Sequence, residues 1–257
     1  MADKTGIHFG RREFVLGMAA PAFLHRPAFL KKPVRMYAGV EFNVLRYDPV
    51  AFRESPRRYI LVHGDEETAR DILGSYMYDH DGVAFLVTSK SRELEINGVK
   101  IDPNRMFSRV GAELSIRKLT PGLDQAKITA TLDFLDDPKH GRELFLKDLL
   151  PQKGGRIVAL HNNRDYSVND EIAASDEKSI KQPKLPQHFF LCTNAKDYEI
   201  LKQSPYNVVL QSKPDPDDGS LSRLCAKRGV RYINLECAVG EYEAQQERLR
   251  WLDDRLP

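Results

Sequence analysis

The sequence predicts an α/β fold, a doubly wound and mostly parallel β-sheet with helices on both of its faces. Short apolar and β-branched runs of strand length, such as residues 59–62 and 83–88, alternate with longer amphipathic stretches of helix length. Strands that are separated by helices pair in parallel through crossover connections. Several of the runs also end in a polar residue, and open α/β folds place their sites at that carboxyl edge of the sheet.

The expected elements follow one another from residue 33 onward. The expected strands comprise residues 35–45, 59–62, 83–88, 156–160, 189–192, 208–211 and 232–235. The expected helices comprise residues 66–78, 124–150 with a break near Pro138 and Gly141, 195–203, 221–228 and 242–252. The Asn97-Gly98 pair predicts a hairpin over residues 93–101. Residues 169–187 are polar and rich in turn signals, so we expect a long loop at the rim of a site.

Length and composition indicate one globular domain. The chain has 257 residues and a formal net charge of +2, and we expect residues 33–257 to form a single domain with a full-sized core. No basic stretch is dense enough to indicate a nucleic-acid partner. The three cysteines, Cys192, Cys225 and Cys237, are too few for a disulfide framework and lack a C-x-x-C spacing, although one disulfide stays open.

Residues 1–32 are expected to lie outside the fold. The pair Arg11-Arg12 is followed two places later by Phe14 and then by an apolar stretch over residues 15–24, which is too short for a bilayer-spanning helix. This order resembles a Tat-type signal peptide. The resemblance implies export by the Tat machinery to the periplasm or beyond, with no stable membrane span after processing. An amphipathic first helix with an incidental arginine pair is the alternative.

The stretch that ends in His63 and Glu66 carries the first chemical signal. An apolar run over residues 59–62 leads into His63-Gly64-Asp65-Glu66, so both side chains are expected at the carboxyl edge of the sheet. An imidazole and a carboxylate are two of the three protein ligands of a hydrolytic zinc that keeps a position open for water. The alternative is a strand-end histidine beside a solvated glutamate.

A turn with the sequence Asp102-Pro103-Asn104-Arg105 follows the predicted hairpin. Asn104 offers an amide and Arg105 offers a fork of guanidinium donors, which suits a substrate carboxylate held by two hydrogen bonds. Asp-Pro-Asn sequences also begin ordinary turns. The alternative is therefore an Asx-type turn with a solvated arginine.

Two later strands end in further candidates. Residues 157–160 lead into His161, which could approach His63 across neighbouring strands and complete a two-histidine, one-carboxylate zinc set. Residues 232–235 lead into Glu236, a carboxylate that could take the proton of a zinc-bound water and pass it to the leaving nitrogen. Each residue alone could simply end its strand, but four such motifs in one order point to a single site.

The series H-x-x-E, D-x-N-R-x-F, L-H-N and strand-Glu resembles the zinc carboxypeptidase superfamily, including its succinylglutamate desuccinylase and aspartoacylase branch. The resemblance spans residues 59–240 and implies that one zinc ion binds to His63, Glu66 and His161. It implies that Asn104 and Arg105 hold a substrate carboxylate, and that Glu236 is the general base. The fold it implies is the doubly wound, zinc carboxypeptidase-like sheet predicted above.

Three departures from that family bear on the expectations. The branch often has Asp where Ala159 stands, so another group must orient His161 if it is oriented. Twenty-one residues follow Glu236, which leaves room for one closing helix. We therefore expect a site that is more open than in the aspartoacylases. The family's oxyanion-stabilising arginine has no fixed spacing, and Arg92 is the best-placed candidate. Tyr206 is a candidate for the tyrosine that covers the substrate, although no motif marks it.

The resulting expectation is an exported zinc metallohydrolase that cleaves an amide or peptide bond beside a free carboxylate. It would resemble either a metallocarboxypeptidase or an N-acyl amino acid amidohydrolase, and its substrate would be a peptide or an N-acyl amino acid. Two alternatives stay open. One is a cell-wall zinc amidase, which would not need the Asn-Arg pair. The other is a non-catalytic exported binding protein on the same fold.

Overall fold

The structure is a computed structural model that describes residues 35–36, 39–51, 53 and 55–256, without the side chains of residues 35 and 36. The predicted signal segment, residues 1–32 with Arg11 and Arg12, lies outside these described residues. No helix within the described ranges has the length and apolar character needed to cross a membrane.

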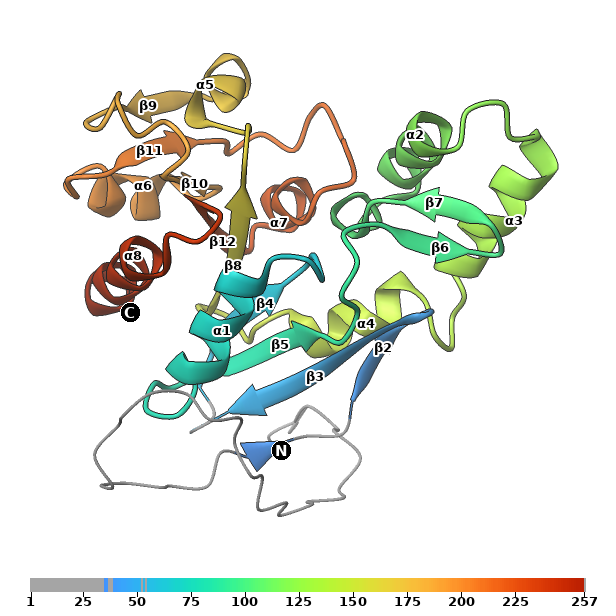
Figure 1. Cartoon of the computed structure of the whole chain (residues 1–257), viewed down its shortest axis with the longest axis horizontal. Coiled ribbons are helices and arrows are strands. Elements are labelled where there is room, and N and C mark those ends of the chain that lie inside the picture. The colour runs from blue at the N-terminus through green and yellow to red at the C-terminus, as the bar shows by residue number, and fades with distance from the viewer. Residues whose placement is uncertain (1–34, 37–38, 52, 54, 257) are drawn as a thin grey trace, which may run out of the picture.

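A mixed sheet forms the centre of the molecule (Figure 1). Its strands run in the order β1-β3-β5-β4-β8-β12-β10-β11-β9, and β2 adds to β3. They are β1 (Arg35–Met36), β2 (Val40–Phe42), β3 (Leu45–Ala51), β4 (Arg57–Leu61), β5 (Val83–Val87), β8 (Arg156–Asn163), β9 (Glu177–Ser179), β10 (Phe189–Cys192), β11 (Asn207–Leu210) and β12 (Arg231–Ala238). The central strands β5, β4, β8 and β12 are parallel, as are β10 and β11, while the outer strands and the β10–β12 pair are antiparallel. The predicted α/β fold with parallel central strands is confirmed.

Helices cover both faces of this sheet (Figure 1). On one face α1 (Glu67–Tyr76) and α8 (Tyr242–Arg255) lie side by side, and both reach Asn162 of β8: the Ala69 N–H donates to its side-chain oxygen and its amide donates to Gln245. On the other face α4 (Arg142–Leu149) places Phe145 against Tyr47 of β3 and Phe85 of β5. Further along, α7 (Leu221–Arg228) packs on β12.

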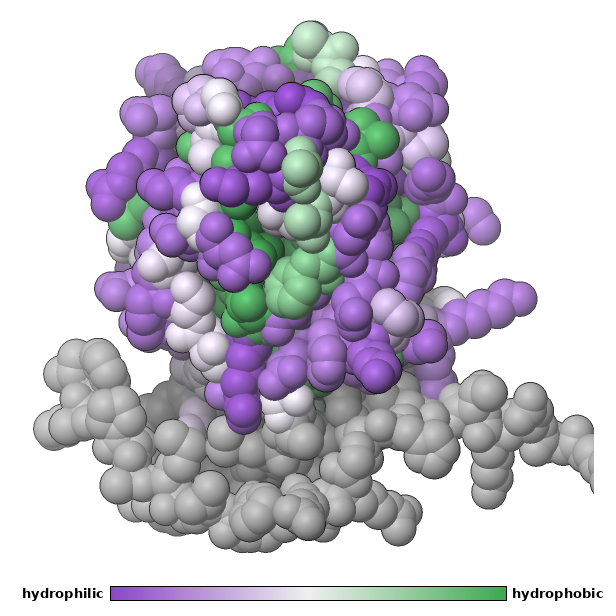
Figure 2. Space-filling view, turned by 90° about the vertical axis from the view of Figure 1, so that its right-hand side faces the viewer, coloured by the Kyte–Doolittle hydropathy of each residue, from purple (hydrophilic) through white to green (hydrophobic). Residues whose placement is uncertain are grey.

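A smaller unit stands at one side of the main sheet. The hairpin of β6 (Leu94–Ile96) and β7 (Val99–Ile101) turns at Asn97 and Gly98, both with positive φ, as the sequence predicted. It packs against α2 (Arg109–Leu119), and α3 (Gln125–Leu135) packs against α2. Figure 2 shows this side of the molecule, where a band of hydrophobic side chains lies among hydrophilic ones.

Several predicted boundaries were wrong. The single strand expected over residues 35–45 is broken, because Asn43 has φ of 54° and turns the chain so that β2 pairs antiparallel with β3. Helix α2 was missed. The expected loop over residues 169–187 contains the end of α5 (Val168–Glu171), the 3-10 turn η2 (Ile172–Ala174) and β9.

The expected break in residues 124–150 is confirmed as the gap between α3 and α4, and α6 (Ala195–Leu201) forms where expected. All three cysteines are buried and unpaired.

Candidate metal centre

The turn between β4 and α1 places His63 and Glu66. Strand β4 is buried along most of its length and stops at Leu61, after which Gly64 passes tightly under the loop that follows β5. The Gly64 N–H donates to the Ser91 carbonyl at 3.1 Å, and a Cβ at residue 64 would lie 2.4 Å from the Ser89 carbonyl oxygen. Only glycine fits this approach, so Gly64 fixes the angle at which His63 and Glu66 leave the strand.

His161 and Glu236 come from the two neighbouring parallel strands β8 and β12. Their Cα atoms are direct partners in the register between these strands. Side chains at paired positions of adjacent strands lie on the same face of a sheet, so the imidazole and the carboxylate are neighbours. The predicted approach of these strand-end residues to the β4–α1 turn is present in the structure.

His63, Glu66 and His161 form one compact cluster. The Nδ1 atom of His63 lies 2.9 Å from Glu66 Oε1, and the Nδ1 atom of His161 lies 3.1 Å from Glu66 Oε2. One ligand atom from each side chain can be chosen so that all three lie within 4.8 Å of one another. Each of these residues is only 3% exposed. This cluster could hold a metal ion.

An unsatisfied buried atom supports metal binding by this cluster. Glu66 Oε2 has no hydrogen-bond partner among the described residues, and its 3.1 Å contact with His161 Nδ1 lacks hydrogen-bond geometry. Buried polar atoms without partners are costly and rare unless a ligand satisfies them. Two imidazoles with one carboxylate are a common protein ligand set of hydrolytic zinc. The residues present therefore fit a zinc ion.

The charges of the cluster depend strongly on one another. Burial would lower the pKa of His63, but the carboxylates of Glu66 and Asp102 together raise this pKa to about 9. Burial would raise the pKa of Glu66, but the imidazoles of His161 and His63 lower it to about 2. Without a metal, the cluster is therefore held together by a protonated His63 beside an ionised Glu66.

Asp102 supports His63 from behind, a role that the sequence interpretation missed. The Oδ1 atom of Asp102 lies 2.9 Å from His63 Nε2 and accepts a hydrogen bond from the Asn104 backbone N–H at 2.8 Å. A carboxylate on the far nitrogen fixes the tautomer and the direction of a ligand imidazole. The residue stands in the Asp-x-Asn-Arg motif, so the signal was present. For His161 the structure shows no such partner, since its Nε2 is unpaired within the described chain.

Glu236 is held by two amides that the sequence interpretation also missed. The Asn163 side chain donates to Glu236 Oε2 at 3.0 Å, and the Asn234 side chain donates to Oε1 at 3.1 Å. Glu236 is 5% exposed, and this burial raises its pKa above the usual carboxyl range, while His161 opposes the shift. A buried carboxylate with a raised pKa beside a candidate metal site is suited to carrying a proton.

The turn η1 (Pro103–Arg105) brings Asn104 and Arg105 next to the cluster, because Asp102 at its start contacts His63. The side-chain oxygen of Asn104 accepts a hydrogen bond from the Leu221 N–H at 3.2 Å. Arg105 donates from Nη1 to the Asn104 carbonyl at 2.9 Å and lies 3.8 Å from Asp218. Its side chain is 37% exposed, so part of the guanidinium can reach a ligand in solvent.

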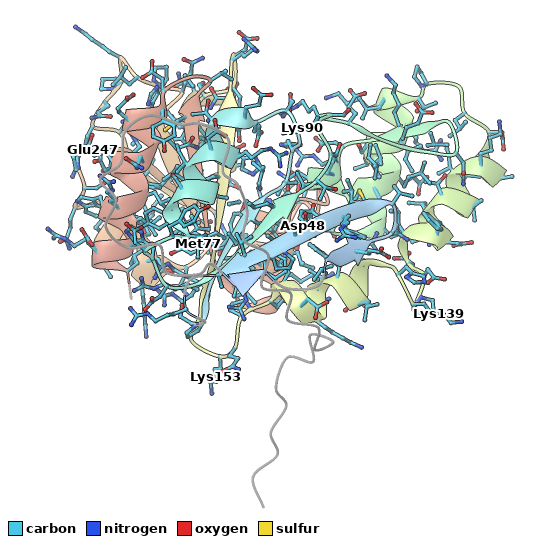
Figure 3. The ribbon with its side chains drawn as sticks, turned by 60° about the horizontal axis from the view of Figure 1, so that its bottom comes forward. Asp48, Met77, Lys90, Lys139, Lys153 and Glu247 are labelled. Carbon is cyan, nitrogen blue, oxygen red and sulfur yellow. The ribbon has the colours of Figure 1, made fainter. Side chains whose placement is uncertain are left out.

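Arg92 also reaches the cluster. It lies on the loop after β5, in which Lys90 is labelled in Figure 3, and its Nη1 atom is 3.3 Å from Glu66 Oε1 and 3.8 Å from Asp65. Its side chain is 52% exposed. The guanidinium therefore stands at the solvent side of the buried triad.

Tyr206 does not lie over the site. It is buried against Phe190 and Trp251, and its hydroxyl donates to Glu247 of α8, which is labelled in Figure 3. Strand β10 alternates its side chains, so Phe190 and Tyr206 occupy the face opposite to Phe189 and Glu236, which are register partners. The structure thus gives Tyr206 a packing position beneath α8.

The chain is similar to a solved structure but matches no family profile. No protein-family profile matches the sequence, and no curated protein matches it. Among solved structures, the chain is similar to a succinylglutamatedesuccinylase/aspartoacylase from Rhodobacter sphaeroides, with a TM-score of 0.42 and 10% sequence identity. The match covers 87% of this chain and 65% of that one, so the chain spans somewhat less than two thirds of that structure's length.

Proposed function

We propose that this chain is an exported zinc-dependent hydrolase that cleaves an amide or peptide bond next to a free carboxylate. The observation that supports it most is the buried His63–Glu66–His161 cluster with Glu236 beside it in strand register. Neither part alone would indicate hydrolysis. Together they offer a two-histidine, one-carboxylate metal set and a separate carboxylate that can move a proton.

Each residue then has one task. A zinc ion on the three ligands would lower the pKa of a water molecule toward neutrality and polarise the scissile carbonyl. Glu236 accepts the proton of that water on a carboxylate oxygen and delivers it to the leaving nitrogen. The guanidinium of Arg92 stabilises the negative charge that develops on the carbonyl oxygen. The side-chain amides of Asn163 and Asn234 each donate to one oxygen of the Glu236 carboxylate and so keep it in one orientation.

Asn104 and Arg105 define the substrate class. We call this pair the carboxylate clamp, because an amide and a guanidinium beside the metal cluster can hold a carboxylate by charge-assisted hydrogen bonds. A clamped carboxylate next to the cleaved bond makes the product an amino acid or a short peptide. The substrate is accordingly a peptide or an N-acyl amino acid, and export through the Tat route would give the enzyme access to such compounds outside the cytoplasm.

The test compares a substrate with its own amide. A panel of N-acyl amino acids and N-acyl dipeptides, each as free acid and as carboxamide, is screened with the zinc-loaded mature protein, and the free acid cleaved fastest is kept with its amide. Glu236→Gln keeps the size of the side chain but cannot accept a proton. We expect it to retain zinc and to lose roughly a hundred- to ten-thousandfold in kcat on the free acid.

Arg105→Ala should act on only one member of the pair. It removes the charge-assisted hydrogen bonds that the guanidinium makes to the carboxylate of the free acid. The neutral carboxamide cannot form these charged contacts, so kcat/KM should fall steeply for the free acid and little for the amide. Equal losses on both substrates would favour a cell-wall zinc amidase without a clamp. Binding of the panel with no turnover of any compound would favour the non-catalytic binding protein, and full activity of Glu236→Gln would refute the proposed general base.

A further inference from the structure

A loop far along the chain packs against the turn that carries the carboxylate clamp. Residues 217–221 comprise the end of the connection between β11 and α7 and the first residue of α7, more than a hundred positions after Asn104 and Arg105. The Phe107 N–H donates to the Gly219 carbonyl at 3.0 Å, and the Ser108 hydroxyl donates to Asp217 at 2.7 Å. These bonds hold the loop against the two residues that immediately precede α2.

Gly219 makes the closest approach. Its φ is +77°, and a Cβ at this position would lie 2.3 Å from the Arg105 carbonyl oxygen and 2.7 Å from the Cα of Gly111. Gly111 faces it in the same way, since a Cβ there would lie 2.1 Å from the Cα of Gly219. Both clashes are with backbone atoms, which cannot move aside as a side-chain end can. The backbone of Arg105 therefore rests directly on Gly219.

The same loop fixes how the Asn104 amide is presented. Its oxygen accepts the N–H of Leu221, the first residue of α7, at 3.2 Å. Because the oxygen and the nitrogen of an amide point to opposite sides, this bond turns the two N–H donors of Asn104 away from the loop. Donors are what a carboxylate needs, so the loop sets the amide in the orientation that the clamp requires.

Arg105 is restrained from the same direction. Asp218 accepts hydrogen bonds from the backbone N–H and the hydroxyl of Ser220 through Oδ1, at 2.9 and 2.6 Å, and its Oδ2 lies 3.8 Å from Arg105 Nη1. Arg105 Nη1 also donates to the Asn104 carbonyl. One nitrogen of the guanidinium is thus tied to the protein, while no hydrogen bond to the described residues engages Nε or Nη2.

We propose that residues 217–221 are the positioning element of the carboxylate clamp, with Gly219 as the residue on which its placement depends. This inference rests on the proposed function. Two segments set the specificity for a free carboxylate, and of these only residues 104–105 touch the substrate. The loop itself contributes by holding Asn104 and Arg105 at the distance and angle that the carboxylate requires.

The test is Gly219→Ala, measured on the free-acid and amide pair selected above. A misplacement of about an ångström costs up to a hundredfold in rate, so we expect kcat/KM for the free acid to fall roughly ten- to a hundredfold, mainly through KM. The values for the amide and the zinc content should change little. Gly122→Ala is the matched control, because Gly122 has φ of +81° and open space around its Cβ position, so it shares the backbone strain but not the contact.

Equal behaviour of Gly219→Ala and Gly122→Ala would overturn the inference, as would equal losses on the free acid and the amide. If Gly219→Ala does not fold, Leu221→Pro replaces it. Proline is favoured at the first position of a helix and removes only the N–H that Asn104 accepts, and Leu221→Ala controls for the lost side chain. A higher KM for the free acid in Leu221→Pro than in Leu221→Ala supports the inference, and equal values refute it.

The failure of this inference is distinguishable from failure of the proposed function. If wild type cleaves no free acid, or if Arg105→Ala affects both substrates equally, the clamp itself is wrong. If Arg105→Ala removes the preference for the free acid while Gly219→Ala and Leu221→Pro leave it intact, the clamp stands and the positioning loop is refuted.

Discussion

Replacing Asp102 with Asn tests whether this carboxylate strengthens metal binding by fixing the tautomer and the direction of the His63 imidazole. Asp102 Oδ1 lies 2.9 Å from His63 Nε2 and also accepts the Asn104 N–H at 2.8 Å. An Asn side chain still offers an oxygen to that N–H, so the turn is kept while the negative charge is lost. Losing the carboxylate behind a ligand imidazole costs roughly ten- to a hundredfold in metal affinity, or about 1.4–2.7 kcal/mol.

The assay is a competition titration of zinc between the metal-free protein and a chromophoric chelator at neutral pH. Asp65→Asn is the control, since Asp65 neighbours the candidate ligand Glu66 in sequence but is 45% exposed and pairs with Arg92 at 3.8 Å. We expect Asp102→Asn to bind zinc more weakly than wild type by the stated factor, and Asp65→Asn to bind it with nearly the wild-type affinity. An unchanged dissociation constant in Asp102→Asn would show that the 2.9 Å contact does nothing for metal binding.

Two further predictions concern proton binding and export. In the metal-free protein, His63 has a pKa of about 9 against an ordinary 6.5, so its contribution of about 3 kcal/mol to stability is fully present below pH 6.5 and is lost as the pH rises through 9. Urea unfolding of wild type and His63→Gln across that range measures it, and an equal pH dependence in both proteins would contradict the assignment. Arg11→Lys combined with Arg12→Lys should leave the protein in the cytoplasm, because paired arginines are the feature that identifies a Tat signal. Cell fractionation decides this, and unchanged export would show that residues 1–32 have another role.

The sequence predicted the parts of the fold and site that depend on local patterns. Short, continuous runs of mostly apolar and β-branched residues define β4, β8 and β12, and a polar residue at the end of each run marks the carboxyl edge of the sheet. For this reason the sequence alone assigns His63, His161 and Glu236 to one region. The β6–β7 hairpin was predictable for the same reason, since Asn97-Gly98 is a local signal.

The features that were missed depend on contacts between distant segments. The reversal at Asn43 is held by a distant contact, since its backbone N–H donates to the His140 carbonyl at 2.7 Å, and a single asparagine is only a weak local turn signal. The pairing of Asp102 with His63 joins a turn to a strand end 39 positions earlier, and although the Asp-x-Asn-Arg motif marks Asp102, nothing local links it to His63. Asn163 and Asn234 hold Glu236 only because β8 and β12 are adjacent in the sheet. The same holds for Tyr206, which packs beneath α8 against Phe190, a residue that β10 directs to the face opposite to Glu236.

The central claim is that His63, Glu66 and His161 bind one zinc ion, and elemental analysis of the purified mature protein tests it most directly. The protein is prepared without a metal-affinity step, alongside His161→Ala and, as control, His140→Ala, which removes an exposed imidazole that is 62% accessible. We expect close to one zinc per chain in wild type and in His140→Ala, and loss of zinc from His161→Ala, because removing one of three ligands sacrifices most of the chelate. Full zinc occupancy in His161→Ala, or a wild-type protein that binds no zinc even when it is supplied, would contradict the account.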